Sequence, residues 1–223
     1  MELLAPGRRF SGARSNLTSF ARTGDVQRMR SGVRHYVSTG YGGSANLSRR
    51  LAGTGRTARN LSGVLDPSTG ESLLDRKLLS SRSAEEVMDA VVEAARPHDG
   101  TQDAESAREA IRDALADVLE RFNDADLLAL TDEQRRYAIE SFTAHDVYRR
   151  FQLDVGKHLL DKAPSKAVAL ARFKQVRAYI KETVAEAFRK VTDAGAKLST
   201  SSVQETVRMA MSEALRVFEE YVE

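Results

Sequence analysis

Apolar residues recur every three or four positions through most of the chain after residue 83, a spacing that predicts amphipathic helices. The first of these helices begins at Ser83, because Ser83 and Glu86 can satisfy each other's backbone amides, and it stops before Pro97. A second helix is predicted from about Asp103 to Phe122. Both have a polar face opposite the apolar one, as expected of helices that pack on a core.

Three further helices follow from the same reasoning. A capping box at Thr131–Gln134 opens a long helix that ends at Pro164, and its apolar residues cover more than one face, so we place it near the centre of the fold. The next stripe runs from Ala169 to Val191 and closes at Gly195, a residue suited to a left-handed cap. A cap at Ser202–Glu205 opens the last helix. No long stretch alternates with period two, so the predicted fold class is all-α, a bundle of about five to six helices.

The first 65 residues have a weaker pattern. Short helices are predicted at Ser15–Ala21 and Asp25–Val37, and Thr39–Ser44 is predicted to form a tight glycine turn. Leucines recur at helical spacing over Ala45–Leu65, but each of the three glycines in that segment costs a helix about 1 kcal/mol relative to alanine. We therefore expect this helix to need a partner surface, and the segment as a whole to be only partly helical.

Charge divides the chain at about the same place. The net charge is +2, yet residues 1–65 hold eleven arginines, no lysine and only two acids, which gives +9 and leaves −7 for residues 66–223. The first part also contains ten of the fourteen glycines. We predict two domains, a basic segment rich in arginine, glycine and serine over 1–65 and an acidic helical bundle over 66–223, with a hinge at Leu65–Gly70.

A basic surface of this kind can meet protein carboxylates or nucleic-acid phosphates, and the spacing of the arginines does not choose between them. A third interpretation is a loosely packed helical subdomain whose arginine stems lie along its own surface. All three stay open on the residues alone.

Composition excludes several classes of protein. The chain has no cysteine, so it has no disulfide and no thiolate zinc site, and it suits a reducing cytosol. Its longest apolar run is five residues, Ala167–Ala171, against the roughly 20 needed to span a bilayer. We expect a soluble, cytoplasmic protein that does not bind a membrane.

Few residues are candidates for chemistry. His145 and Asp146 could belong to a metal-dependent hydrolase site, but no further ligands have suitable spacing, so we predict no metal and a partly buried or surface position for His145. The glycine turn leads into a helix with Arg49 and Arg50 and could hold a phosphate, although it lacks the lysine and the preceding strand of a P-loop. No catalytic residue is assigned and no cofactor is implied, so we expect a protein that is not an enzyme.

Several strings of residues are specific to one known family and not generic motifs. They are Arg9–Arg14, Phe20–Gly24, His35–Ser44, Arg82–Glu93, Asp99–Ala104 and Asp161–Ser165, together with the final helix. Over nearly the whole chain they resemble the QatB family of anti-phage defence proteins. The resemblance implies a component of a four-gene system whose other members are an ATPase, a QueC-like protein and a TatD-like DNase.

The resemblance further implies a non-enzymatic subunit that binds the QueC-like protein and is its substrate, receiving a deazaguanine-type nucleobase at its N-terminus. The ATPase and the DNase are additional expected partners. Similar proteins have a longer Gly/Pro-rich arm, whereas here only Met1–Pro6 precede Gly7, so we expect the modification site to be absent and assign no modified residue. The alternative is a nucleic-acid-binding module. The predicted partner-binding residues are Arg8, Arg9, Phe10, Arg14, Arg22, Tyr36, Tyr41, Gly42, Gly43, Arg49 and Arg50.

Overall fold

The computed structural model describes residues 9–68 and 74–222, and within them every regular element is helical. The α-helices are α1 (Ser11–Thr23), α2 (Val26–His35), α3 (Ser44–Arg50), α4 (Ala52–Leu65), α5 (Arg76–Leu79), α6 (Ala84–Ala95), α7 (Gln102–Arg121), α8 (Asp132–Phe151), α9 (Lys157–Lys162), α10 (Lys166–Asp193) and α11 (Val203–Glu219). Two π-helical segments, η1 (Tyr36–Gly40) and η2 (Gln152–Gly156), continue α2 and join α8 to α9. The all-α prediction is confirmed.

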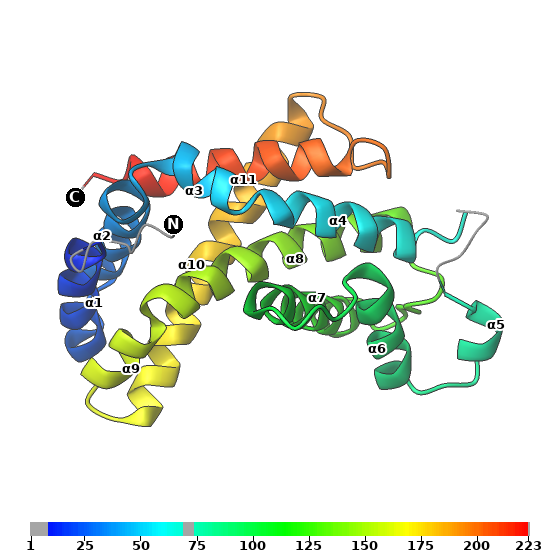
Figure 1. Cartoon of the computed structure of the whole chain (residues 1–223), viewed down its shortest axis with the longest axis horizontal. Coiled ribbons are helices and arrows are strands. Elements are labelled where there is room, and N and C mark those ends of the chain that lie inside the picture. Colours follow the sequence, from blue (N-terminus) through cyan, green and yellow to red (C-terminus); the bar gives the residue numbers. More distant parts are fainter. Residues whose placement is uncertain (1–8, 69–73, 223) are drawn as a thin grey trace.

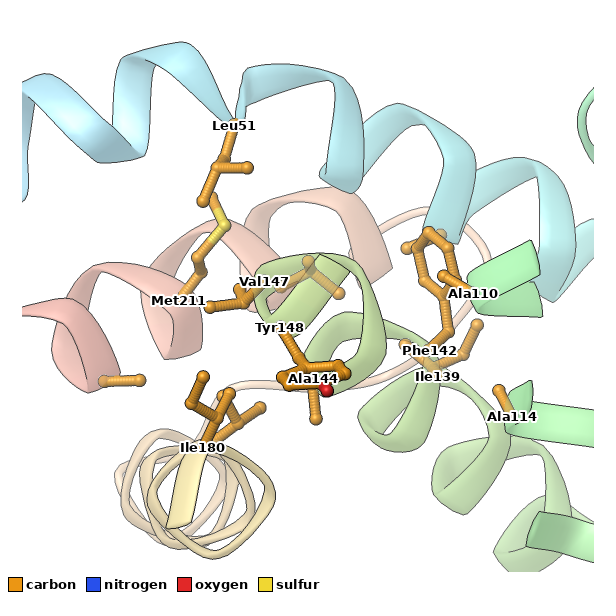
Figure 2. Close-up of a cluster of buried hydrophobic side chains, with 14 of the residues drawn as sticks. Leu51, Ala110, Ala114, Ile139, Phe142, Ala144, Val147, Tyr148, Ile180 and Met211 are labelled. Atoms are coloured by element: carbon orange, nitrogen blue, oxygen red, sulfur yellow. The ribbon is translucent and has the colours of Figure 1, made fainter. Parts of the chain in front are cut away.

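Helix α8 lies at the centre of the fold, as its many-sided apolar pattern predicts (Figure 1). It packs against α4, α7, α10 and α11. In Figure 2, Val147 of α8 lies beside Met211 and Leu51, while Phe142 points toward α4 and α7. Phe142 is fully buried. Because α8 has helices packed on several sides, its buried residues are spread around the helix and no continuous polar face remains.

Most of the predicted helix boundaries are correct. Ser83 and Thr131 form capping boxes with Glu86 and Gln134, and Gly195 follows α10 with φ +97°. The cap predicted at Ser202 is wrong. Its hydroxyl donates backward to the Lys197 carbonyl at 2.6 Å and accepts nothing from α11, because the preceding loop brings that carbonyl next to Ser202 and to Thr206 of α11, which also donates to it at 2.6 Å.

Residues 9–65 form four α-helices, where the sequence pattern predicted three. The helix predicted from Ser15 begins at Ser11, and the single helix predicted over 45–65 is two helices that meet at Leu51. We expected the helix over 45–65 to need a surface to pack on, and α11 provides one for α4. A Cβ on Gly55 would lie 3.1 Å from the Gln204 carbonyl oxygen, so the missing side chain lets the two backbones approach closely.

A single hydrophobic core contains residues from both sides of the predicted division at residue 65. Helices α3 and α4 pack on α11, α4 also packs on α6 and α8, and α1 packs on α9. Asp66, in the predicted hinge, pairs with Arg135 of α8 at 3.4 Å. Residues 69 and 70 of that hinge lie outside the described residues. No helix of the described chain is both long and apolar enough to cross a membrane.

Candidate functional site: an arginine-rich surface and an aromatic clamp

The arginines of the first segment are left without acidic partners. Ten arginines lie in residues 9–65, and none of them makes a salt bridge to a described carboxylate. Residues 74–222 hold fifteen arginines, and ten of these do. The positive charge of the first segment therefore stays available to something outside the described chain.

Four of the predicted partner-binding arginines lie on that exposed surface. Arg14 and Arg22 are on α1, and Arg49 and Arg50 end α3. Arg49 donates a hydrogen bond to the neutral Asn46 side chain, and the side chains of the other three make no hydrogen bond or ion pair in the described structure. An unpaired guanidinium presents a planar fork of donors that suits carboxylates and phosphates.

Four other predicted residues come together with Asp154 in a cluster that we call the aromatic clamp: Arg9, Phe10, Tyr36, Tyr41 and Asp154. The two tyrosine hydroxyls donate to the same oxygen of Asp154, at 2.8 Å from Tyr36 and 2.6 Å from Tyr41. The Phe10 ring stacks on Tyr36 at 5.5 Å, and the Arg9 guanidinium lies 4.2 Å from the Tyr41 ring centre. These contacts tie the start of α1 to η1 and η2.

Burial raises the pKa of both clamp tyrosines, and the Asp154 carboxylate raises it further, to about 12 for Tyr41. Both phenols therefore keep their protons at neutral pH and act as donors to Asp154. Tyr36 is almost completely buried, whereas Phe10 and Tyr41 are half-buried. The clamp therefore lies mainly inside the fold, and only Phe10 and Tyr41 reach the surface in part.

Glycine is required where the clamp closes. A Cβ on Gly40 would lie 2.6 Å from the Phe10 ring, and the Gly40 carbonyl accepts a 2.7 Å hydrogen bond from Arg9 Nε. Gly42 and Gly43 have φ of +72° and +110°, so the predicted glycine turn is confined to these two residues, while Gly40 belongs to η1.

The turn does not offer open amides to a phosphate. The Ser44 amide donates to a Glu219 carboxylate oxygen at 2.9 Å, and the Gly43 amide donates to the Val37 carbonyl at 3.1 Å. A carboxylate of the chain itself thus occupies the position that a bound anion would need.

His145 is fully buried, and the prediction that it lies partly buried or at the surface is wrong. Its Nε2 donates to Asp117 Oδ2 at 2.8 Å, and Lys181 Nζ donates to the same oxygen at 2.5 Å. The Ser141 hydroxyl also donates to Asp117. We call these four residues the Asp117 network; it joins α7, α8 and α10, and the sequence alone gives no sign that these helices meet there.

Partial burial raises the pKa of Asp117, but the hydrogen bonds from His145, Lys181 and Ser141 outweigh that effect and hold it well below the ordinary value. The serine donates to the carboxylate and not to the histidine, so the network is not the arrangement of a nucleophile with its base. Asp146 faces away from it and accepts a 2.5 Å hydrogen bond from Thr54 on α4. His145 and Asp146 therefore do not form one site, and no described group of three or more acidic, histidine or cysteine side chains is placed to hold a metal.

The structure gathers Arg9, Phe10, Tyr36 and Tyr41 into the clamp, and it leaves Arg14, Arg22, Arg49 and Arg50 spread over α1 and α3. Arg8 lies outside the described residues. The sequence analysis did not single out Arg56 and Arg59, which are exposed on α4 and unpaired. A signal for them exists, because no acid lies within four residues of either. The partner-binding role of all these residues stays a prediction.

Comparison with known protein families gives a match to most of the chain. The model of the family described as QatB, Qat anti-phage system associated protein QatB, matches residues 42–218. The chain belongs to the QatB family. It is thus a component of an anti-phage defence system, as its resemblance implied. The resembling strings Arg9–Arg14 and Phe20–Gly24 lie outside the matched residues, and the string His35–Ser44 lies outside them up to Tyr41. No curated protein and no solved structure matches the chain.

Proposed function

We propose that this QatB-family chain is a non-enzymatic subunit that docks on the QueC-like protein of its Qat system through the arginines of α1. The observation that carries the proposal is the contrast in pairing: the arginines of residues 9–65 have no carboxylate partner in the described chain, whereas most of those after residue 74 do. Unpaired arginines do little for stability, so their presence is better explained by an external partner.

Two features make α1 the docking helix of choice. The clamp holds its start through Phe10, and α1 packs on α2 and α9, so Arg14 and Arg22 project from a fixed support. Figure 1 places α1 at one end of the molecule, at the surface. A rigid basic helix at an edge can meet an acidic face of a partner with little loss of conformational freedom.

The QueC-like protein is proposed to transfer a deazaguanine-type nucleobase to the N-terminus of its QatB-family substrate, and no residue of this sequence is assigned as the modified one. The non-enzymatic role is supported by the Asp117 network, in which His145 Nε2 and the Ser141 hydroxyl both donate to the Asp117 carboxylate and not to each other. The ATPase and the TatD-like DNase are further proposed partners.

The test is co-expression with the QueC-like protein, followed by size-exclusion chromatography of the complex. Point variants are preferable to removal of residues 1–65, because α4 contributes Leu61 and Leu65 to the shared core and its loss would expose that core. We expect Arg14→Glu combined with Arg22→Glu to abolish co-elution, since two attractive contacts become repulsive.

The matched control is Arg136→Glu, which makes the same charge change at an exposed arginine of α8 with no side-chain partner in the described structure. It is expected to co-elute like the wild type. Co-elution of the double variant at wild-type strength would overturn docking through α1. Failure of the wild-type chain to co-elute would overturn the partner itself.

A further inference from the structure

A surface pocket of about 530 Å³ lies between α4, the start of α7 and the end of α8, and no residue of α1 lines it. Its lining comes from Arg50 and Arg56 on one side and from Thr101, Ser106 and Arg150 on the other, among other residues. The volume is in the range of small-molecule sites, which run from about 300 to 1,000 Å³. The size therefore suits a ligand larger than a single ion.

Positive charge dominates this pocket. Five arginines line it, against two aspartates; the arginines are Arg50, Arg56, Arg59, Arg96 and Arg150. Arg150 pairs with Asp103 at 3.1 Å, and Arg96 pairs with Asp99, which is outside the lining, at 2.7 Å. The remaining three guanidinium groups have no partner among the described residues. Their charge is concentrated in a concave surface, where an anion would be attracted most strongly.

The acids of the pocket are already engaged. Asp103 is held by Arg150, and Asp146 accepts a 2.5 Å hydrogen bond from the Thr54 hydroxyl. Burial raises the pKa of Asp146, and the Thr54 hydrogen bond only partly offsets that rise. Neither carboxylate is therefore placed to pair with Arg56 or Arg59.

The polar groups around the arginines fit phosphate oxygens. Thr57, Asn60 and Ser106 add neutral donors to the lining. Two helices also begin at the pocket, α4 at Ala52 and α7 at Gln102, and both helix starts contribute lining residues. The positive ends of their dipoles reinforce the arginines, although the guanidinium groups supply most of the charge.

We propose that the pocket of α4 and α7 binds a ligand with adjacent phosphate groups, such as a nucleoside triphosphate or a short stretch of nucleic-acid backbone. Three unpaired arginines call for more than one phosphate, and Arg56 and Arg59 lie one helical turn apart on α4. The lining holds no aromatic side chain on which a base could stack, so recognition is of phosphate and is indifferent to base identity. This inference does not rest on docking to the QueC-like protein.

The experiment measures binding of three probes to the full chain: pyrophosphate and ATP by calorimetry, and a fluorescein-labelled twelve-nucleotide single strand by anisotropy, at about 50 mM salt. Binding is expected for at least one of the three probes. ATP binding without strand binding would identify a nucleotide site, and strand binding without ATP binding would identify a backbone site. In either case, Arg56→Glu combined with Arg59→Glu is expected to weaken binding by at least about 100-fold, since removal of each charge-assisted hydrogen bond weakens binding roughly tenfold.

Two controls make the result specific to the pocket. The Arg136→Glu variant is expected to bind the probes with an affinity within about twofold of the wild type. The same is expected of the docking variant with Arg14→Glu and Arg22→Glu. Circular dichroism checks that each variant is folded. Absence of binding by all three probes would overturn the proposal. Binding unchanged in the folded Arg56 and Arg59 variant would also overturn it, because the phosphate would then be held elsewhere.

Discussion

In residues 74–222 an arginine commonly fastens one helix to another through a carboxylate, as Arg149 of α8 does with Asp113 of α7 at 2.7 Å, whereas in residues 9–65 no arginine does so. The first segment is held instead by apolar packing, by the aromatic clamp and by the close approach of backbones at Gly55. The difference separates two uses of one residue type. Exposed arginines of residues 9–65 without a described carboxylate partner are the ones to which we assign a protein partner and a phosphate ligand as proposals.

The largest expected effect comes from breaking the Asp117 network. Asp117→Ala leaves His145 and Lys181 without their shared acceptor, and loss of one partner of a buried ion pair costs about 3–5 kcal/mol. The free energy of unfolding from urea denaturation should fall by roughly that amount. Asp124→Ala, at an exposed loop position, serves as the control and should change it by no more than about 0.5 kcal/mol. A similar small change for Asp117→Ala would contradict the network's role.

Acid should lower the free energy of unfolding, because carboxylates that are ion-paired in residues 74–222 become protonated. The folded pKa of Asp117 is lowered, and that of Glu213 is lowered to about 2 by Arg216 and Lys190. Their stabilisation is complete above the unfolded pKa of about 4 and is lost as pH falls toward the folded value, so it disappears between about pH 5 and pH 2.

The measurement for this prediction is the free energy of unfolding across that range, for the wild type and for Asp117→Asn. The variant lacks the Asp117 titration, so its curve should fall less steeply, by a total on the order of 2 kcal/mol. Curves of equal slope would show that Asp117 is not held ionised by the network.

A smaller effect is expected from the first segment, where packing replaces charge. Gly40→Ala places a methyl group within 2.6 Å of the Phe10 ring, which Tyr36 holds in place by stacking, and overpacking of this kind costs about 1–3 kcal/mol. Thermal unfolding measures the effect, and Gly53→Ala is the matched control. No atom lies within 4 Å of a Cβ at Gly53, so alanine there should stabilise α4 by up to about 1 kcal/mol. Equal effects of the two substitutions would refute the close contact.

The smallest expected changes in the free energy of unfolding come from replacing one arginine in each part of the chain. Arg149→Ala removes the ion pairs with Asp113 and Glu109 and should lower the free energy of unfolding by about 1 kcal/mol. Arg22→Ala should change it by less than about 0.5 kcal/mol, because the Arg22 side chain has no partner in the described structure. Urea titrations of both variants test this, and a larger decrease for Arg22→Ala would reverse the assignment of roles.

Local signals carried most of the fold prediction. The capping boxes at Ser83 and Thr131 and the cap at Gly195 depend on residues within four positions, and all are present. The error at Ser202 arose because a tertiary loop brings the Lys197 carbonyl to its hydroxyl. The break at Leu51 was missed for a similar reason, since leucine spacing alone does not show that the chain bends over α11.

The functional features also differ in whether nearby residues or distant contacts reveal them. The excess of arginine over acid could be read directly from residues 1–65, and the structure adds that the arginines of residues 9–65 make no salt bridge to a described carboxylate. The clamp joins Phe10 to Asp154, and the Asp117 network joins α7 to α10, so both depend on contacts between residues far apart in the chain. The pocket is likewise built from α4, α7 and α8, and no single stretch of sequence could have indicated it.

The two π-helical segments set a strict requirement on chain length. Asp154 lies in η2 and Tyr36 in η1, so the clamp forms at the two places where a helix carries an extra residue in its turn. Deletion of one residue within 152–156 would restore an ordinary helix and rotate everything after it by about 100° relative to α8. Relatives of this chain that lose a residue there should therefore lose the Asp154 carboxylate from the clamp, and with it the shared acceptor of Tyr36 and Tyr41. Insertions and deletions at these two points should be far rarer than substitutions.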